Sequence, residues 1–263
     1  MFSVETYLSA IGYDGPTEPN AQTLRELHRR HLMLIPFNNS AQADLGTAVL
    51  NDVDVNLDET FEKVVVRRQG GVCFELSGMF QRLLRELGYD VIMLSSGVRG
   101  PSGAFGPDLE HMFLGVRLDG EVWLTDVGFA GPGYVDPLLL SPEVQEQYGC
   151  QYRVLPQGEY HVVDRKTQAG DWQAVYRFRL QPRTLAEWEG AGGSGDEDDP
   201  GWNWEGEIVA AGTVIRARSF EEGQMVLVGR RYLRVDGGHE KVRVLVDPVD
   251  FQAVVDDILG VAG

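Results

Sequence analysis

The sequence is poor in basic side chains. Lysine and arginine total 23 against 40 aspartate and glutamate residues, which gives a formal net charge of −17 over 263 residues. Nucleic acids and anionic membranes are polyanions that bind through lysine and arginine, so an acidic surface repels both. The composition therefore predicts a protein that binds neither nucleic acid nor a membrane.

Long apolar runs are lacking, and cysteine is rare. No stretch approaches the roughly 18 apolar residues of a membrane helix, and the first residues, MFSVETY, show no basic region ahead of an apolar one. The two cysteines, Cys73 and Cys150, could pair, but without secretory features a reducing compartment is expected. We therefore expect a cytoplasmic protein in which Cys150 has a structural role.

The remaining composition is typical of a globular protein with a sizeable core, with 43% hydrophobic and 24% charged residues. Apolar residues recur at helical spacing in four stretches of the first 88 residues, namely 4–11, 23–33, 57–65 and 76–87. Short β-type runs bounded by Gly, Pro and Asp-Gly then predict strands at 91–94, 111–118, 122–125, 152–155, 160–163 and 174–180.

The C-terminal part combines strands with a closing helix. Further β-type runs lie at 207–210, 213–217, 225–228 and 231–235, and apolar spacing predicts a helix at 247–259. The whole pattern predicts an α+β fold, in which an N-terminal helical bundle (1–88) is followed by a central antiparallel β-barrel or sheet (89–186) and a C-terminal α/β lid (206–263).

Residues 187–205 connect the last two regions and have an unusual composition. A glycine-rich run is followed by four consecutive acidic residues and a proline. This composition is typical of a solvated linker. The alternative is a mobile flap beside the site, with Trp188, Trp202 and Trp204 as its apolar contacts.

A glycine turn delivers one cysteine to the start of a helix. Gly70 and Gly71 precede Cys73, and the helical pattern begins directly after it. The unpaired N–H groups and the positive end of the dipole at a helix N-terminus favour an anion, and the thiolate is the nucleophilic form of cysteine. The alternative is a packing role, because free cysteines are among the most buried residues.

A histidine and an aspartate downstream favour the nucleophilic role of Cys73 over a packing role. His111 begins one predicted strand and Asp126 follows the next, and Asp119-Gly120 between them is typical of a hairpin turn. The hairpin would bring both side chains to one face. Cysteine, histidine and aspartate then supply the three roles of a thiol acyl-transfer site: nucleophile, general base and acid, and the group that orients the imidazole.

These motifs together resemble the arylamine N-acetyltransferase family. The resemblance covers most of the chain and rests on Arg-x-Gly-Gly-x-Cys-Phe-Glu at 68–75, on Asp-Val-Gly-Phe at 126–129, and on family-like stretches at 7–16, 23–28 and 35–37. It implies the same three-part build, a Cys73-His111-Asp126 triad, no tightly bound cofactor, and an acyl thioester as the donor.

Other positions depart from that family. The usual coenzyme-contacting stretch is replaced by the acidic segment within 187–205. In addition, Asn38 stands where Glu is common, Ser77 where Asn is common, Glu110 where Ser or Thr is common, and Ala130 where Gly is common. The family also includes amide synthases that release an aminoaryl-primed polyketide from its carrier protein, as a macrolactam or an open amide. The chain resembles that branch more than a coenzyme A user.

The predicted function is therefore amide formation through a Cys73-bound acyl thioester, with an aryl amine or acyl thioester as substrate and an acyl carrier protein as partner. Acetyl-coenzyme A:arylamine N-acetyltransferase is the alternative. A thiol peptidase, a transglutaminase-like enzyme and a binding protein without activity remain open as other classes. Arg67, Arg68 and Arg99 are candidate docking residues for an acidic carrier.

The substrate pocket and the histidines complete the candidates. Aromatic residues suit a flat aryl substrate, although a core would use them too, and the residues proposed to bind substrate are Phe37, Phe74, Phe105, Phe129 and Ala130. His28 and His31 lie at a spacing of three on a helix, but no further ligands are suggested nearby, so we expect surface or partly buried residues and no metal site.

Overall fold

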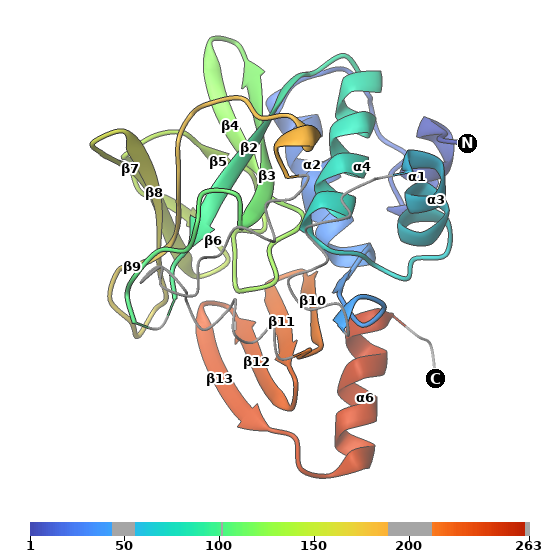
Figure 1. The fold of residues 1–263 in the computed structure, drawn as a ribbon, viewed down its shortest axis with the longest axis vertical. Helices are drawn as coiled ribbons and strands as arrows, with labels where there is room; N and C mark the ends of the chain where they lie inside the picture. Colours follow the sequence, from blue (N-terminus) through green and yellow to red (C-terminus); the bar gives the residue numbers. More distant parts are fainter. Residues whose placement is uncertain (44–55, 101, 189–211, 261–263) are drawn as a thin grey trace.

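The computed structural model describes residues 1–43, 56–100, 102–188 and 212–260, and it has the predicted α+β architecture. Helices of the first 88 residues pack against an antiparallel sheet of eight strands, and a second sheet of five strands with a final helix lies beneath both (Figure 1). No helix among these residues is long and apolar enough to cross a membrane.

All four predicted N-terminal helices are present: α1 (Val4–Ala10), α2 (Ala21–Leu34), α3 (Leu57–Phe61) with its π-helical continuation η2 (Glu62–Val66), and α4 (Cys73–Glu86). Short polar side chains begin three of them, since the side chains of Ser3, Asn20 and Asn56 accept hydrogen bonds from first-turn N–H groups. The apolar spacing fixed the faces that meet in the core.

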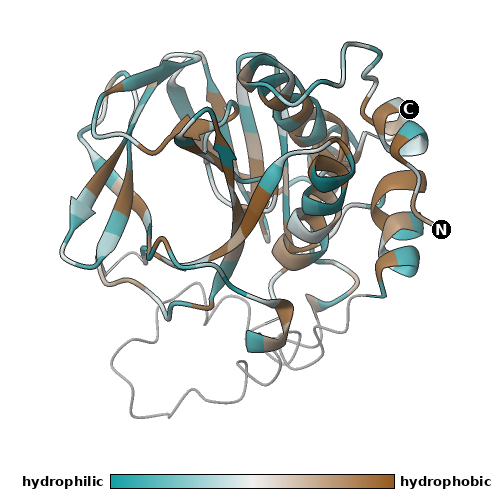
Figure 2. Cartoon of the chain, turned by 90° about the horizontal axis from the view of Figure 1, so that it is seen from above, coloured by the Kyte–Doolittle hydropathy of each residue, from teal (hydrophilic) through white to brown (hydrophobic). Residues whose placement is uncertain are grey.

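The eight-stranded sheet has the order β5-β4-β3-β2-β9-β8-β7-β6. Its strands are β2 (Asp90–Val98), β3 (His111–Leu118), β4 (Glu121–Thr125), β5 (Leu138–Leu139), β6 (Gln145–Gln147), β7 (Cys150–Gln157), β8 (Tyr160–Lys166) and β9 (Gln173–Phe178). The segment after β5 also reaches β7, because Val154 N–H donates to Ser141 O over 3.0 Å. The sheet therefore curls almost into a barrel (Figure 2).

The second sheet forms the lid with helix α6 (Pro248–Leu259). Its order is β1 (Phe37–Asn38), β10 (Ile215–Phe220), β11 (Gly223–Val228), β12 (Arg231–Asp236) and β13 (His239–Val244). Strands β1, β5, β6 and β13 were not predicted: the first three are too short to show a pattern, and β13 is exposed along its whole length. The predicted strand 207–210 lies outside the described residues.

One strand of the lid sheet comes from the N-terminal region of the chain. Strand β1 comes from the first 88 residues but pairs with β10 of the lid, with Phe37 opposite Ala217. Of the connection at 187–205, the structure describes only the first two residues, and Trp188 is buried there, with its indole N–H donating to Leu109 O over 2.8 Å. The division at 88, 186 and 206 stays a prediction.

Two hairpin turns hold the lid against the barrel. Gly149 in the β6–β7 turn and Gly238 in the β12–β13 turn lie backbone to backbone: a Cβ on Gly238 would be 2.1 Å from Gly149 O, and one on Gly149 would be 2.2 Å from Gly237 O. Gln168 adds hydrogen bonds to both lid glycines, at 3.2 and 2.9 Å. Only residues without side chains permit this approach.

Substituting these glycines tests the contact. Gly237 and Gly238 both have positive φ, at 53° and 78°, but a Cβ on Gly237 meets no atom within 4 Å. Each Ala substitution carries the backbone strain of about 1–2 kcal/mol, whereas only Gly238→Ala forces two backbones apart. We expect Gly238→Ala to lower the free energy of unfolding by about 1–3 kcal/mol more than Gly237→Ala, as measured by urea denaturation. Equal losses would contradict the contact.

Candidate active site

The turn at residues 67–71 places Cys73 at the first position of α4, as predicted. Gly70 has φ 74°, and a Cβ there would lie 2.4 Å from Pro36 O, so only glycine fits. The N–H of Asn38 donates to Gly71 O over 3.0 Å. The turn is thereby held against β1, and Cys73 remains partly exposed.

A partly buried ion pair fixes the start of α4. The Glu75 carboxylate accepts from Lys63 Nζ at 2.8 and 2.9 Å and from the N–H of Val72 at 3.1 Å. A carboxylate at this position also complements the positive end of the helix dipole. Because Glu75 already uses the N–H of Val72, the N–H groups available to a ligand are those of the first turn of α4, which follow Val72.

His111 and Asp126 meet as the hairpin predicts. The turn between β3 and β4 has Asp119 and Gly120 at φ 53° and 82°, the conformation that matches strand twist. His111 begins β3 and Asp126 directly follows β4, and His111 Nε2 lies 2.8 Å from Asp126 Oδ2 with both side chains buried. The aspartate N–H and second carboxylate oxygen also have partners, His28 Nε2 at 2.9 Å and Gly128 N–H at 3.2 Å.

The charge of Asp126 determines the protonation of His111. Burial lowers the pKa of His111, but the negative charge of Asp126 and hydrogen bonds with Asp126 and Cys73 outweigh it and raise that pKa to about 10. Nε2 is occupied by Asp126. Nδ1 is therefore the nitrogen left to face the Cys73 thiol.

The segment after β4 closes around the cysteine. A Cβ on Gly128 would lie 2.7 Å from Cys73 Cα and 3.0 Å from its carbonyl oxygen. This glycine is required because the segment packs directly on the backbone at the head of α4. The cysteine, the histidine and the aspartate, predicted from three separate elements, are thus brought into one cluster.

Aromatic rings surround the imidazole, and sequence patterns did not predict all of them. His111 stacks on Phe113 at 6.1 Å between ring centroids and contacts the rings of Phe129 at 5.4 Å and Tyr176 at 5.8 Å. The hydroxyl groups of Tyr176 and Tyr134 are hydrogen-bonded over 3.0 Å. Burial is the main cause that raises the pKa of Tyr176 above its ordinary value. Nothing in the sequence of β9 distinguishes Tyr176 from a core residue, so no local signal reveals its position.

The prediction that His28 and His31 are surface or partly buried residues was wrong. Both side chains are fully buried, His31 bonded to the Tyr7 hydroxyl at 2.7 Å and His28 to Asp126. They lie inside because α2 is covered on one side by α4 and on another by the segment after β4, a placement that helical spacing alone does not reveal. Among the residues that the structure describes, no three metal-ligating side chains cluster, and both cysteines are free thiols.

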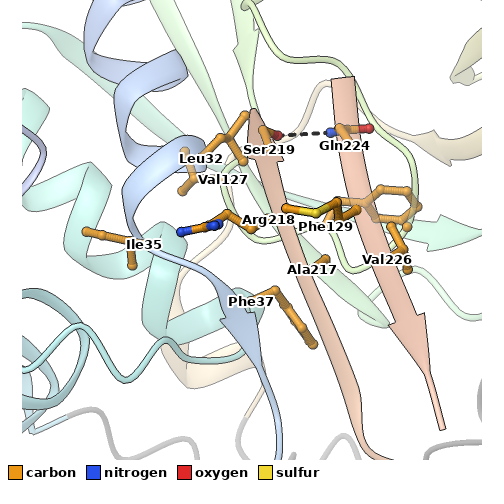
Figure 3. Close-up of a pocket in the computed structure, with 12 residues that line it drawn as sticks. Leu32, Ile35, Phe37, Val127, Phe129, Ala217, Arg218, Ser219, Gln224 and Val226 are labelled. Carbon is orange, nitrogen blue, oxygen red and sulfur yellow. Dashed lines mark hydrogen bonds between the residues drawn. The ribbon is translucent and has the colours of Figure 1, made fainter. Parts of the chain in front are cut away.

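A small pocket of about 20 Å³ lies beside the cluster, between α2 and the lid strands (Figure 3). Phe37 and Phe129 line it. Phe129 also contacts the His111 ring, and Phe37, like Cys73, packs against the apolar cluster that contains Phe74. The remaining lining residues are Leu32, Ile35, Val127, Gly131, Ala217, Arg218, Ser219, Gln224, Met225 and Val226. Most of these residues are apolar, but a space of this volume holds about one water molecule and no aryl ring.

A second, larger pocket of about 220 Å³ lies between the barrel and the lid. Phe129 and Gly131 line it as well, so they stand between the two pockets. Arg99 and Arg165 also line it, and Arg165 is bonded to Glu240 of the lid at 2.7 Å. A ligand that reaches from one pocket to the other would pass the Phe129 ring.

The residues predicted to bind substrate are therefore spread over several environments. Phe37 and Phe129 line a pocket. Phe74 is buried in a cluster with Met112 and Trp188, Phe105 lies against the Arg177 guanidinium at 5.1 Å, and Ala130 is half-buried next to Phe129. Their role in binding stays a prediction.

The state of His111 can be measured directly. We expect its ring to stay protonated up to about pH 10. A raised pKa means that the stabilisation from this pair is complete below the ordinary value of about 6.5 and is lost as the pH rises from there to about 10. Asp126→Asn removes the main opposing charge and should lower the pKa of His111, as followed by ¹⁵N NMR of histidine-labelled protein. A wild-type His111 with a pKa at or below 6.5 would contradict the ion pair between His111 and Asp126.

Comparison with known proteins identifies the family of this chain. A family profile described as N-acetyltransferase matches residues 20–262. The chain is 41% identical over 98% of its length to proansamycin X synthase of Amycolatopsis mediterranei, which it covers to 97%, and 31% identical over 96% to arylamine N-acetyltransferase of Mycobacterium tuberculosis, covered to 86%. The structure of Mycobacterium marinum arylamine N-acetyltransferase has a TM-score of 0.81 at 28% identity, over 98% of this chain and 93% of that one. The chain belongs to the arylamine N-acetyltransferase family.

Proposed function

We propose that this chain is an amide synthase, which takes an acyl group from a thioester onto Cys73 and passes it to an amine. Its substrate would be an aminoaryl polyketide on a carrier protein, released as a macrolactam or an open amide. The observation that carries this proposal is the 41% identity over 98% of the chain to a protein named proansamycin X synthase. The position of Cys73 beside the buried His111–Asp126 pair supports it.

The first half-reaction loads the enzyme. The Cys73 thiolate attacks the thioester carbonyl, a new C–S bond forms, and the bond to the carrier thiol breaks. His111, kept as imidazolium by Asp126, supplies the proton that the leaving thiol takes. Exchange of one thioester for another is nearly balanced in energy.

The second half-reaction releases the product in ping-pong order. The amine attacks the acyl group, the C–N bond forms, and the C–S bond to Cys73 breaks while His111 accepts the amine proton. Asp126 holds the imidazole in its tautomer throughout. Because an amide is more stable than a thioester, this step drives the cycle, and no tightly bound cofactor is needed.

Backbone N–H groups at the head of α4 would stabilise the oxyanion in both halves. Gly70 and Gly71 form the turn that exposes this helix end, and the N–H of Val72 is already used by Glu75. The N–H groups of the first helical turn are thus the candidate donors. Loss of one such donor typically slows a reaction about 10²–10³-fold.

The pockets suggest how substrate is placed. Phe37 and Phe129 would contact the aryl amine beside the cluster, and the larger pocket between barrel and lid would take the acyl chain. Phe74, Phe105 and Ala130 remain proposed contacts. In this arrangement residues 1–88 contribute the nucleophile, 89–186 the histidine and aspartate, and 206–263 the lid.

The choice of donor separates the proposal from its alternative, acetyl-coenzyme A:arylamine N-acetyltransferase. One similar structure is that of the Mycobacterium marinum enzyme in complex with CoA, at 27% identity and a TM-score of 0.80. An acidic carrier would need basic contacts on this acidic chain. Arg68 is exposed at the turn before α4 and Arg99 lines the larger pocket, whereas Arg67 is already paired with Glu62 at 3.2 Å.

Intact-mass spectrometry tests the donor. The protein is mixed separately with acetyl-coenzyme A and with a long aminoaryl acyl thioester of pantetheine, a short mimic of a carrier. We expect rapid acylation by the long thioester, followed by release of a lactam or amide, and little or no acetylation. Rapid acetylation with transfer to an aryl amine, and no reaction of the long thioester, would instead identify the alternative.

Two cysteine variants locate the acyl group. Cys73→Ala should show no mass increase with either donor, because it lacks the nucleophile. Cys150→Ala removes the other, buried thiol and should be acylated like the wild type. A wild-type protein that gains no acyl group, or a Cys73→Ala variant that does, would contradict the whole mechanism.

A further inference from the structure

His28 binds both ends of the segment that follows β4. Its Nε2 accepts the N–H of Asp126 at 2.9 Å, and its Nδ1 lies 2.8 Å from the carbonyl oxygen of Val135. These two residues bound the segment 126–135, which runs from β4 towards β5. A single fully buried ring on α2 thus holds a segment that is about a hundred residues away in the sequence.

The two contacts determine the tautomer of this ring. A carbonyl oxygen can only accept, so Nδ1 carries the proton, and an amide N–H can only donate, so Nε2 must be unprotonated. Burial lowers the pKa of His28 and outweighs its hydrogen bond to Val135 and the charges of Asp126 and Asp136. The ring is therefore neutral, which is the state that can make both bonds at once.

The segment carries much of the candidate site. Asp126 holds His111, Gly128 packs on the backbone of Cys73, and Phe129 contacts the His111 ring and lines both pockets. A shift of this segment would move all three together. The two hydrogen bonds of His28 tie this segment to α2 and thereby set the distance between the segment and Cys73.

We propose that His28 is a positioning residue, whose neutral ring clamps segment 126–135 so that Asp126 stays on His111 and Gly128 stays against Cys73. The inference rests on the proposed function in one respect, namely that His111 and Asp126 take part in acyl transfer. His28 itself touches neither substrate nor the reacting atoms.

The surroundings of His28 keep the ring in place. Tyr134 of the same segment stacks on it at 5.9 Å with an interplanar angle of 14°, and Phe80 of α4 contacts it edge-on at 6.1 Å. The titratable groups that face it are Asp126, Asp136 and Tyr134 from the segment and its continuation, and His31 from α2. Those carboxylates would stabilise a protonated ring, which could no longer accept from the N–H of Asp126.

Two substitutions at His28 separate its two bonds. The amide of Asn occupies the place of Nδ1, so His28→Asn keeps a donor for Val135 and loses the acceptor for Asp126. The longer Gln places its amide oxygen near Nε2, so His28→Gln keeps the acceptor. His31→Asn is the matched control: it is equally buried on the same helix, but its Nδ1 bonds Tyr7 and its Nε2 has no partner among the described residues.

We expect His28→Asn to slow acylation of Cys73 about 10²-fold, the effect that a small misplacement of catalytic groups has, while KM for the donor stays unchanged. It should also lower the pKa of His111 in ¹⁵N NMR, because Asp126 no longer holds its place. His28→Gln should keep the rate within a few-fold and leave the pKa of His111 in place, and His31→Asn should do the same. A structural role alone would make the two Asn variants alike.

The outcomes distinguish this clamp from the proposed function. Equal rates and equal His111 titrations in His28→Asn and His31→Asn would overturn the clamp, as would a folded His28→Gln that is as slow as His28→Asn. If His28→Asn does not fold, the Gln variant decides, since a hundredfold loss in that folded protein excludes the clamp. If the wild type is not acylated at all, the proposed function fails, and the titration of His111 still tests the clamp.

Discussion

The buried contact between His111 and Asp126 places the strongest demand on the surrounding structure. A carboxylate removed from water is stable only when a charge partner and hydrogen bonds replace its hydration. Here one oxygen of Asp126 holds His111, the other accepts the N–H of Gly128, and the aspartate's own N–H donates to His28. These contacts come from β3, from the segment after β4 and from α2. Satisfying one buried charge thus fixes the distance between the helices and the barrel.

The site lies where the three regions meet, and this position explains its chemistry. The helical region supplies Cys73 at a helix N-terminus, where anions are favoured, and the barrel supplies the imidazolium beside it. The lid supplies one wall of the small pocket and Glu240 of the larger one. The contact between Gly149 and Gly238 and the ion pair between Arg165 and Glu240 hold it there. The pockets include residues of the lid, whereas the cysteine, histidine and aspartate come from the helical region and the barrel. A site of this kind can keep one reaction and accept different acyl chains.

Similarity over the whole chain to both a proansamycin X synthase and arylamine N-acetyltransferases fits this separation. The groups near Cys73 serve acyl transfer in general, because any thioester passes through the same attack, oxyanion and release. The choice between a short acetyl group and a long polyketide depends on the pockets and on the surface that meets the donor. The acidic stretch within 187–205, where sequence analysis expects a departure from the coenzyme-using pattern, lies outside the described residues.

The sequence by itself determined the helices, the β-rich middle, the closing helix and the start of α4 at Cys73, because apolar spacing and glycine turns are local signals. It also indicated His111 and Asp126, since Asp119-Gly120 fixes a hairpin that brings them together. Only the tertiary structure decided the rest: β1 joining the lid, Tyr176 against the imidazole, and the full burial of His28, which sequence analysis had expected to be at the surface or partly buried. Helical spacing shows which residues share a face, but not which distant segment covers it. For His28 that segment begins at Asp126, and no local pattern records a contact made across such a separation.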